Sequence, residues 1–171
     1  MPICFARAMD SRVADGIFPS FVEILKRLTS DEAKILNHLK KIANEQGGIV
    51  VPIVHIQQEE MDANGKRIGG LDVVKNRSLI GIQAGCEYPR QTPSYLDHLA
   101  HLGLVVFLAY GTHYQDMSVY RDVELDPDNL ELRREYDQPP RYRSKYVHTG
   151  LELTTYGRHF ISACVTPYGS T

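Results

Sequence analysis

The stretch of this chain that most restricts its possible folds is residues 92–105. Thr92 and Pro93 are typical of the first positions of a helix. Apolar residues then recur at helical spacing, and Gly103 suits the left-handed end of a helix. A strand that begins at Leu104 follows at once. A helix that ends at a glycine and continues directly into a strand leaves few topologies open.

A second stretch, residues 151–161, predicts another strand and a helix that Thr154 caps. Helix, strand, loop, strand, helix is the order in which a winged helix ends, so we expect an α+β, winged-helix-like fold. Between the two stretches, apolar and polar residues alternate over residues 118–125 and 130–136. This alternation predicts extra strands and therefore an enlarged, strand-containing wing.

Two helices are expected near the start of the chain. Thr29-Ser30-Asp31-Glu32 fits a capping box, in which a hydroxyl and a carboxylate satisfy backbone amides reciprocally. The helix that follows ends near Gly47-Gly48. A shorter helix before it begins near Pro19, because proline is favoured in a first helical turn.

The chain that follows these helices carries weaker signals. Residues 49–56 are apolar and β-branched, which predicts a strand, and Pro52 favours a place near a sheet edge. Residues 59–70 are polar and contain Asn64-Gly65, which predicts a loop or the tip of a hairpin. Residues 72–84 are expected to form one or two short helices.

The length of 171 residues is that of one domain with a tail. We expect an N-terminal helical segment over 1–28, a winged-helix-like domain over 29–166 and a frayed tail over 167–171. No apolar run approaches the ~20 residues that span a bilayer. The start of the chain lacks the features of a signal peptide, and three cysteines without CxxC spacing are expected to be reduced. We therefore expect a cytoplasmic protein with no membrane partner.

Three groups of segments carry a family resemblance: residues 6–10 with 18–33, residues 84–86 with 95–104, and residues 153–160 with 163–164. In this order and combination they resemble the bacterial abortive infection alpha (Abi-alpha) family, domains of unknown function linked to phage defence. The resemblance implies an antiviral defence domain but supplies no reaction. Members of that family usually carry a further helical region upstream, so segment 1–28 is expected to be the remnant of that region.

The apolar residues of this first segment are candidates for an interface. Ile3, Phe5 and Met9 would lie on a short helical stub with little to pack against, and exposed apolar surface often marks a contact site. The stub either packs back on the domain or pairs with a second copy. We expect a homo-oligomer formed through this segment.

Few residues are arranged for chemistry. His98 and His101 lie three apart on the helix of residues 92–101, but no cysteine or carboxylate close by in the sequence completes a metal shell. No set of nucleophile, base and orienting group is evident either. We therefore expect neither an enzyme nor a metal or other cofactor.

Nucleic-acid binding is the alternative that a winged helix suggests. The outward face of the helix before the wing carries no arginine or lysine, which is poor chemistry for a polyanion. Tyrosines and cations alternate over residues 141–146, which could track a phosphate backbone or else place the two residue types on opposite faces of a solvated strand. The second interpretation is favoured, because acids outnumber bases over residues 111–146. The candidate nucleic-acid-binding residues are Arg90, Arg133, Arg134, Arg141, Arg143 and Lys145.

With a net charge of −2, the protein as a whole has no electrostatic attraction for nucleic acid, so any such attraction must come from a local cluster of cations. The sequence thus favours a non-enzymatic interaction domain of winged-helix type that self-associates and has a possible protein partner. The alternative is a winged helix that binds nucleic acid with a basic, tyrosine-rich wing.

Overall fold

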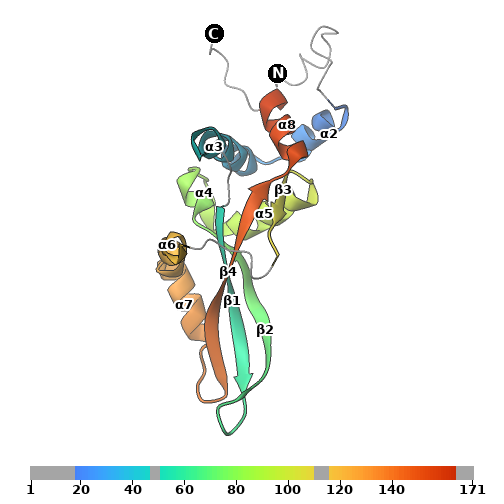
Figure 1. Ribbon diagram of the computed structural model, residues 1–171. Helices are drawn as coiled ribbons and strands as arrows, with labels where there is room; N and C mark the ends of the chain where they lie inside the picture. Colours follow the sequence, from blue (N-terminus) through green and yellow to red (C-terminus); the bar gives the residue numbers. More distant parts are fainter. Residues whose placement is uncertain (1–17, 47–50, 110–115, 165–171) are drawn as a thin grey trace. The chain divides into compact units, whose positions relative to one another are not determined.

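The computed structural model describes residues 18–46, 51–109 and 116–164 (Figure 1). These residues form seven α-helices and a four-stranded sheet. Contacts divide the chain into two compact units, and neither unit is a continuous piece of sequence. Unit 1 takes residues 1–49, 81–106 and 153–171, and unit 2 takes residues 50–80 and 107–152.

Unit 1 is a helical unit built around α3. This helix packs against α5 and α8, because its buried residues recur at the spacing of one helical face. The helices are α2 (Ser20–Arg27), α3 (Ser30–Gln46), α4 (Ile80–Gln83), α5 (Thr92–His101) and α8 (Thr155–Cys164). The fully buried side chains of the unit include Phe21, Ile35, Leu36, Leu39, Leu96, Leu99, Leu104 and Phe160.

The end of α5 confirms the role predicted for Gly103. This glycine has φ +73°, a conformation that disfavours any residue with a Cβ. Its N–H donates to the carbonyl of Ala100 (2.9 Å), and the N–H of Leu104 donates to the carbonyl of Leu99 (3.0 Å). These two bonds are those of a Schellman motif, which satisfies the last carbonyls of a helix.

The start of α5 differs from the prediction. Gln91, not Thr92, is the N-cap residue, because a short 3-10 helix over Pro89–Gln91 leads directly into α5. The Thr92 hydroxyl donates instead to the carbonyl of Pro89 (2.6 Å). Thr92 is therefore the C-cap residue of the 3-10 helix and the first residue of α5, and it joins the two helices.

Most of the sheet belongs to unit 2, and its strand order is β2-β1-β4-β3. Strand β1 pairs antiparallel with both β2 and β4. Pro52 opposes Gly150 of β4, whereas pairing with β2 starts only at Val54, so the missing proline N–H interrupts no bond on the β2 side. The strands are β1 (Val51–Met61), β2 (Arg67–Arg77), β3 (Val105–Phe107) and β4 (Tyr142–Leu153).

The hairpin predicted around Asn64-Gly65 is confirmed, and it is longer than expected. The Asp62 carboxylate accepts the N–H groups of Asn64 and Lys66, both at 2.8 Å, and Gly65 has φ +77°. Strand β2 then takes residues 72–77 of the stretch 72–84, where one or two helices were predicted. Only α4 is helical there, because pairing with β1 outweighs the weak local helix propensity.

The extra strands predicted over residues 118–125 and 130–136 are wrong. These residues form a 3-10 helix (Met117–Tyr120), α6 (Arg121–Glu124) and α7 (Pro127–Tyr136). Figure 1 shows α6 and α7 along one side of the long strands. Buried Tyr120 and Val123 pack there against Val54 of β1. The described part of the insertion before β4, residues 116–141, is thus mainly helical.

Two further observations concern cysteines and membranes. Cys86 is a free thiol, but Cys164 is disulfide-bonded, so the expectation of reduced cysteines is wrong for Cys164. Among the described residues, no helix combines the length and apolar character needed to cross a bilayer.

Candidate functional site

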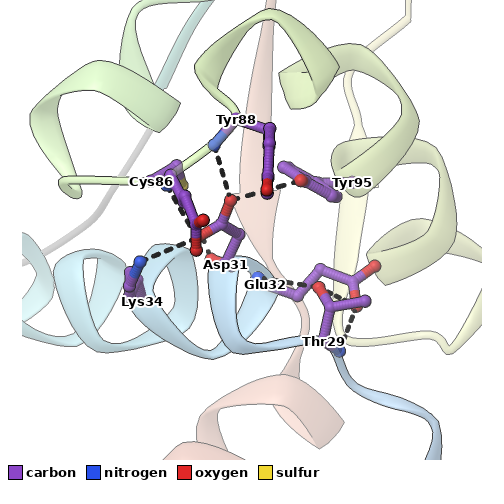
Figure 2. A network of polar contacts seen from close by, with 8 residues as sticks. Thr29, Asp31, Glu32, Lys34, Cys86, Tyr88 and Tyr95 are labelled. Carbon is purple, nitrogen blue, oxygen red and sulfur yellow. Dashed lines mark hydrogen bonds and ion pairs between the residues drawn. The ribbon is translucent and has the colours of Figure 1, made fainter.

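A buried carboxylate, Asp31 in the first turn of α3, organises the polar interior of unit 1 (Figure 2). Asp31 is 2% exposed. It accepts the backbone N–H groups of Glu87 and Tyr88, both at 2.9 Å, in the loop before α5. The Lys34 ammonium (2.8 Å) and the Tyr95 hydroxyl of α5 (3.2 Å) also donate to it. One carboxylate thus joins α3, the loop and α5.

These contacts shift the pKa values around Asp31. The hydrogen bond from Lys34, together with the two backbone donors, holds the pKa of Asp31 well below its usual value. The same hydrogen bond raises the pKa of Lys34. Burial raises the pKa of Tyr95, and the nearby Asp31 raises it further. Asp31 is therefore a fixed anion, whose role in unit 1 is to hold backbone and side-chain donors.

The Cys86 side chain lies beside this site but is not activated by it. Its thiol points at the backbone carbonyl of Asp31, with 3.6 Å between sulfur and oxygen. Burial raises the pKa of the thiol, and the Asp31 carboxylate adds to that shift. A raised pKa lowers the thiolate fraction at neutral pH, which is the opposite of what a nucleophile needs.

Glu32, the next residue, completes the predicted capping box and adds a partner. Its carboxylate accepts the Thr29 N–H (2.7 Å), and its own N–H donates to the Thr29 hydroxyl (3.2 Å). The other carboxylate oxygen lies 2.6 Å from Nδ1 of His98. His98 is therefore turned toward α3. Within residues 18–46, 51–109 and 116–164, no three potential ligands gather as a metal site would require.

A second junction in unit 1 joins the two ends of the predicted winged helix. The Thr154 N–H donates to the carbonyl of Leu104 (3.1 Å), and the Thr154 hydroxyl donates to that of Gly103 (2.6 Å). The same hydroxyl accepts the N–H of Gly157 (2.8 Å), so Thr154 caps α8 as predicted. A Cβ on Gly157 would lie 1.9 Å from the carbonyl oxygen of Leu104. Only glycine fits this close approach.

The predicted nucleic-acid-binding residues are divided between the units. Exposed Arg90 lies in the 3-10 helix of unit 1, and the other five lie in unit 2. Arg133 and Arg134 belong to the last turn of α7. The remaining three are all exposed: Arg141 directly precedes β4, and Arg143 and Lys145 lie near its start.

Acidic residues of β1 already pair with part of this basic set. Glu59 lies 2.5 Å from the Lys145 ammonium and 3.2 Å from Nε of Arg67 on β2. Glu60 lies 3.0 Å from the Arg141 guanidinium. In the β1–β4 register, Arg143 is directly opposite Glu59. Glu59 thus contacts two cations and lies opposite a third, and Asp72 of β2 is a second carboxylate on the same face, where the Gln57 amide donates to it (3.2 Å). The sequence did not predict this arrangement.

The tyrosines of β4 face the other side of the sheet. The Tyr146 hydroxyl donates to the carbonyl of Glu124 (2.9 Å) on α6, and the Arg133 guanidinium lies over the Tyr146 ring, 4.7 Å from its centroid. Tyr142 has the same parity along the strand, so it shares this side. The prediction that bases and tyrosines occupy opposite faces is therefore confirmed at Tyr146.

Comparison with known proteins identifies the family. The family model described as abortive infection alpha matches residues 5–164, nearly the whole chain. The chain belongs to the abortive infection alpha family. The resemblance noted from the three groups of segments is thus confirmed. In unit 1 of this family member, residues from these groups meet where Tyr95 donates to Asp31 and at the Gly157–Leu104 contact.

Two other comparisons were with solved structures and with curated proteins. A solved structure of an uncharacterized protein from the hydrocarbon-degrading marine bacterium Alcanivorax borkumensis SK2 is 21% identical to this chain. That match covers 92% of this chain and 99% of the other, with a TM-score of 0.48. No curated protein matches the chain.

The predicted interface residues Ile3, Phe5 and Met9 lie outside the described residues.

Proposed function

We propose that this abortive infection alpha protein is a non-enzymatic interaction domain of winged-helix type that self-associates. The observation that carries the proposal is the saturation of Asp31, which takes four hydrogen bonds from donors inside unit 1. A carboxylate used in this way stabilises the fold and has no lone pair left for substrate chemistry. The order α5, β3, β4, α8 supports the winged-helix type.

Self-association is proposed through the N-terminal residues Ile3, Phe5 and Met9. We expect light scattering on the full chain to give the mass of a dimer or larger. Changing Phe5 and Met9 together to serine should reduce that mass toward the monomer, because the apolar contact is lost.

The matched control is Ile82→Ser. Ile82 lies on α4 and is 58% exposed, so this variant also replaces an apolar side chain by serine, but outside the segment of residues 1–28. Its mass should equal that of the wild type. A strict monomer at high protein concentration, or an equal loss of mass in the control, contradicts self-association through this segment.

A second candidate function is nucleic-acid binding by the face of β4 that carries Arg143 and Lys145. One observation favours it: the three cations Arg67, Arg143 and Lys145 share this face with two carboxylates, Glu59 and Asp72, which leaves positive charge on it. Binding to generic DNA or RNA should then fall steeply with salt, and Arg141→Ala with Arg143→Ala should flatten that slope. Absence of binding at low salt eliminates this candidate.

A further inference from the structure

The disulfide of Cys164, the last residue of α8, has one possible partner within the chain. The sequence contains three cysteines, Cys4, Cys86 and Cys164. Cys164 is disulfide-bonded, whereas Cys86 is a free thiol whose sulfur lies 3.6 Å from the carbonyl oxygen of Asp31. Cys86 is therefore not the partner. Elimination leaves Cys4, which lies outside the described residues.

The place of Cys4 in the sequence links this bond to the proposed self-association. Its direct neighbours are Ile3 and Phe5, two of the three residues through which self-association is proposed. A bond between Cys4 and Cys164 would attach this apolar segment to the end of α8.

The start of α2 packs on the same helix. The ring centroid of Phe18 lies 5.8 Å from that of Tyr156 and 6.4 Å from that of His159. His159 and Cys164 are five residues apart on α8, which is about 7.5 Å along its axis. The chain from Cys4 to Phe18 reaches up to ~45 Å when extended. The bond would thus close without strain and would fix residues 4–18 to α8 at both ends.

Phe18 leaves apolar surface open beside this attachment. Its ring packs against buried Phe21, with 5.2 Å between the centroids, and Phe21 packs in turn against buried Phe160, also at 5.2 Å. Phe18 itself is nevertheless 46% exposed. An aromatic ring so exposed at the outer end of a buried aromatic cluster is available to a second copy.

We propose that Cys4 is the disulfide partner of Cys164, and that this bond holds residues 1–17 beside Phe18 in the form that contacts a second copy. A segment fixed at both ends loses less conformational freedom on association, so the bond strengthens the contact. This inference rests on the proposed self-association and names the covalent bond that controls it.

The bond makes self-association sensitive to reduction. A dithiol such as dithiothreitol transfers two electrons and two protons: the S–S bond breaks, each sulfur becomes a thiol, and the reductant closes to a cyclic disulfide. The segment then remains attached at Phe18 alone. Reduction should weaken the dimer roughly tenfold, the cost of ordering about one further residue.

The first measurement establishes which cysteines are bonded. In the denatured, unreduced chain, a maleimide should label Cys86 alone, and after dithiothreitol it should label all three cysteines. In Cys4→Ser, Cys164 should be labelled before reduction, and in Cys164→Ser, Cys4 should be. Labelling of all three cysteines in the unreduced wild type, or a covalent dimer on a non-reducing gel, overturns the inference.

The second measurement is the dissociation constant of the dimer, obtained by sedimentation equilibrium on the full chain. Dithiothreitol and Cys4→Ser should each raise it roughly tenfold. The double variant Cys4→Ser with Cys164→Ser should match Cys4→Ser, because both remove the same bond. Cys86→Ser is the matched control and should behave like the wild type with and without reductant. An equal loss in this control, or a wild-type dimer that reduction does not weaken, overturns the inference.

The place of the contact is tested with Phe18→Ser, which should weaken the dimer, against Ile82→Ser, which should not. A dimer that becomes tighter on reduction would show that the bond keeps the segment on its own chain, and it would overturn the inference. The two proposals fail in different ways. A chain that is monomeric in both redox states contradicts self-association and its control together, whereas a dimer indifferent to reduction contradicts this inference alone.

Discussion

At the scale of single residues, Gly157 shows how one position fixes the contact between distant segments. Its Cα lies so near strand β3 that a methyl group would meet the backbone carbonyl of Leu104, at 1.9 Å from oxygen and 2.8 Å from carbon. A backbone carbonyl cannot rotate away as a side chain could. The sequence indicated Gly157 only as part of a capped helix, since the partner that requires glycine lies about fifty positions away.

Replacing Gly157 by alanine should therefore destabilise unit 1 strongly. We expect Gly157→Ala to lower the free energy of unfolding by about 3 kcal/mol, the upper range for an overpacked buried site. Urea denaturation followed by far-UV circular dichroism measures the change. Gly69→Ala is the control, because a Cβ there meets nothing closer than 3.8 Å. Equal stability of the two variants would show that the close approach to Leu104 is not a constraint.

At the scale of elements, the predictions that rested on one short sequence motif were confirmed. The Schellman end at Gly103, the capping box at Thr29 and the hairpin at Asn64-Gly65 are all confirmed. The strands predicted over residues 118–136 failed because alternation was given too much weight. Buried Tyr120 and Val123 are three residues apart, which is a helical spacing.

A second helical signal in the same segment was also passed over. The Asp126 carboxylate accepts the N–H of Asn129 (3.3 Å), and Pro127 occupies the first turn of α7. Asp followed by Pro is a typical helix start. By contrast, the partners of Asp31 in the loop before α5 could not be predicted, because nothing local in either segment encodes a contact across that sequence distance.

The capping box of α3 gives a prediction for a whole helix. Thr29→Ala removes the hydroxyl that accepts the Glu32 N–H (3.2 Å), so unfolding should become easier by about 1 kcal/mol. Thr29→Ser keeps the hydroxyl and should restore most of that loss. Thr155→Ala, at an exposed position in the first turn of α8, is the control and should stay near the wild type in a urea titration. A Thr29→Ala variant as stable as the wild type would mean that other contacts determine the start of α3.

At the scale of the whole molecule, the chain alternates between two units, and each unit buries a titratable group with a lowered pKa. Unit 1 holds Asp31, whose pKa is lowered chiefly by the hydrogen bond from Lys34. Unit 2 holds His55 of β1, whose pKa is lowered chiefly by burial. The neutral Nδ1 of His55 accepts the N–H of Asn76 (3.2 Å), a residue with φ +58°. A protonated Nδ1 could not accept that bond.

The two groups should weaken the protein in different pH ranges. An unfolded histidine titrates near pH 6.5, and since folding lowers the pKa of His55, the unfolded state takes up its proton first. Stability associated with His55 is thus complete above about pH 6.5 and is lost as the pH falls below it. An unfolded aspartate titrates near pH 3.9, so the stability associated with Asp31 is complete above about pH 4 and is lost below that value.

Acidification should therefore destabilise the protein in two stages, with His55 responsible for the first and Asp31 for the second. Urea titrations between about pH 7.5 and pH 3 measure the free energy of unfolding at each pH. His55→Asn retains an acceptor for the Asn76 N–H but cannot titrate, so it should flatten the curve between about pH 6.5 and 5 and leave the acid limb unchanged. Asp31→Asn should lower stability at neutral pH and flatten only the limb below about pH 4. Because each variant is compared with the wild type, the contributions of the six other histidines to the pH dependence cancel in the difference between the two unfolding free energies. A His55→Asn curve parallel to that of the wild type above pH 5 would show that the buried imidazole does not couple folding to protons.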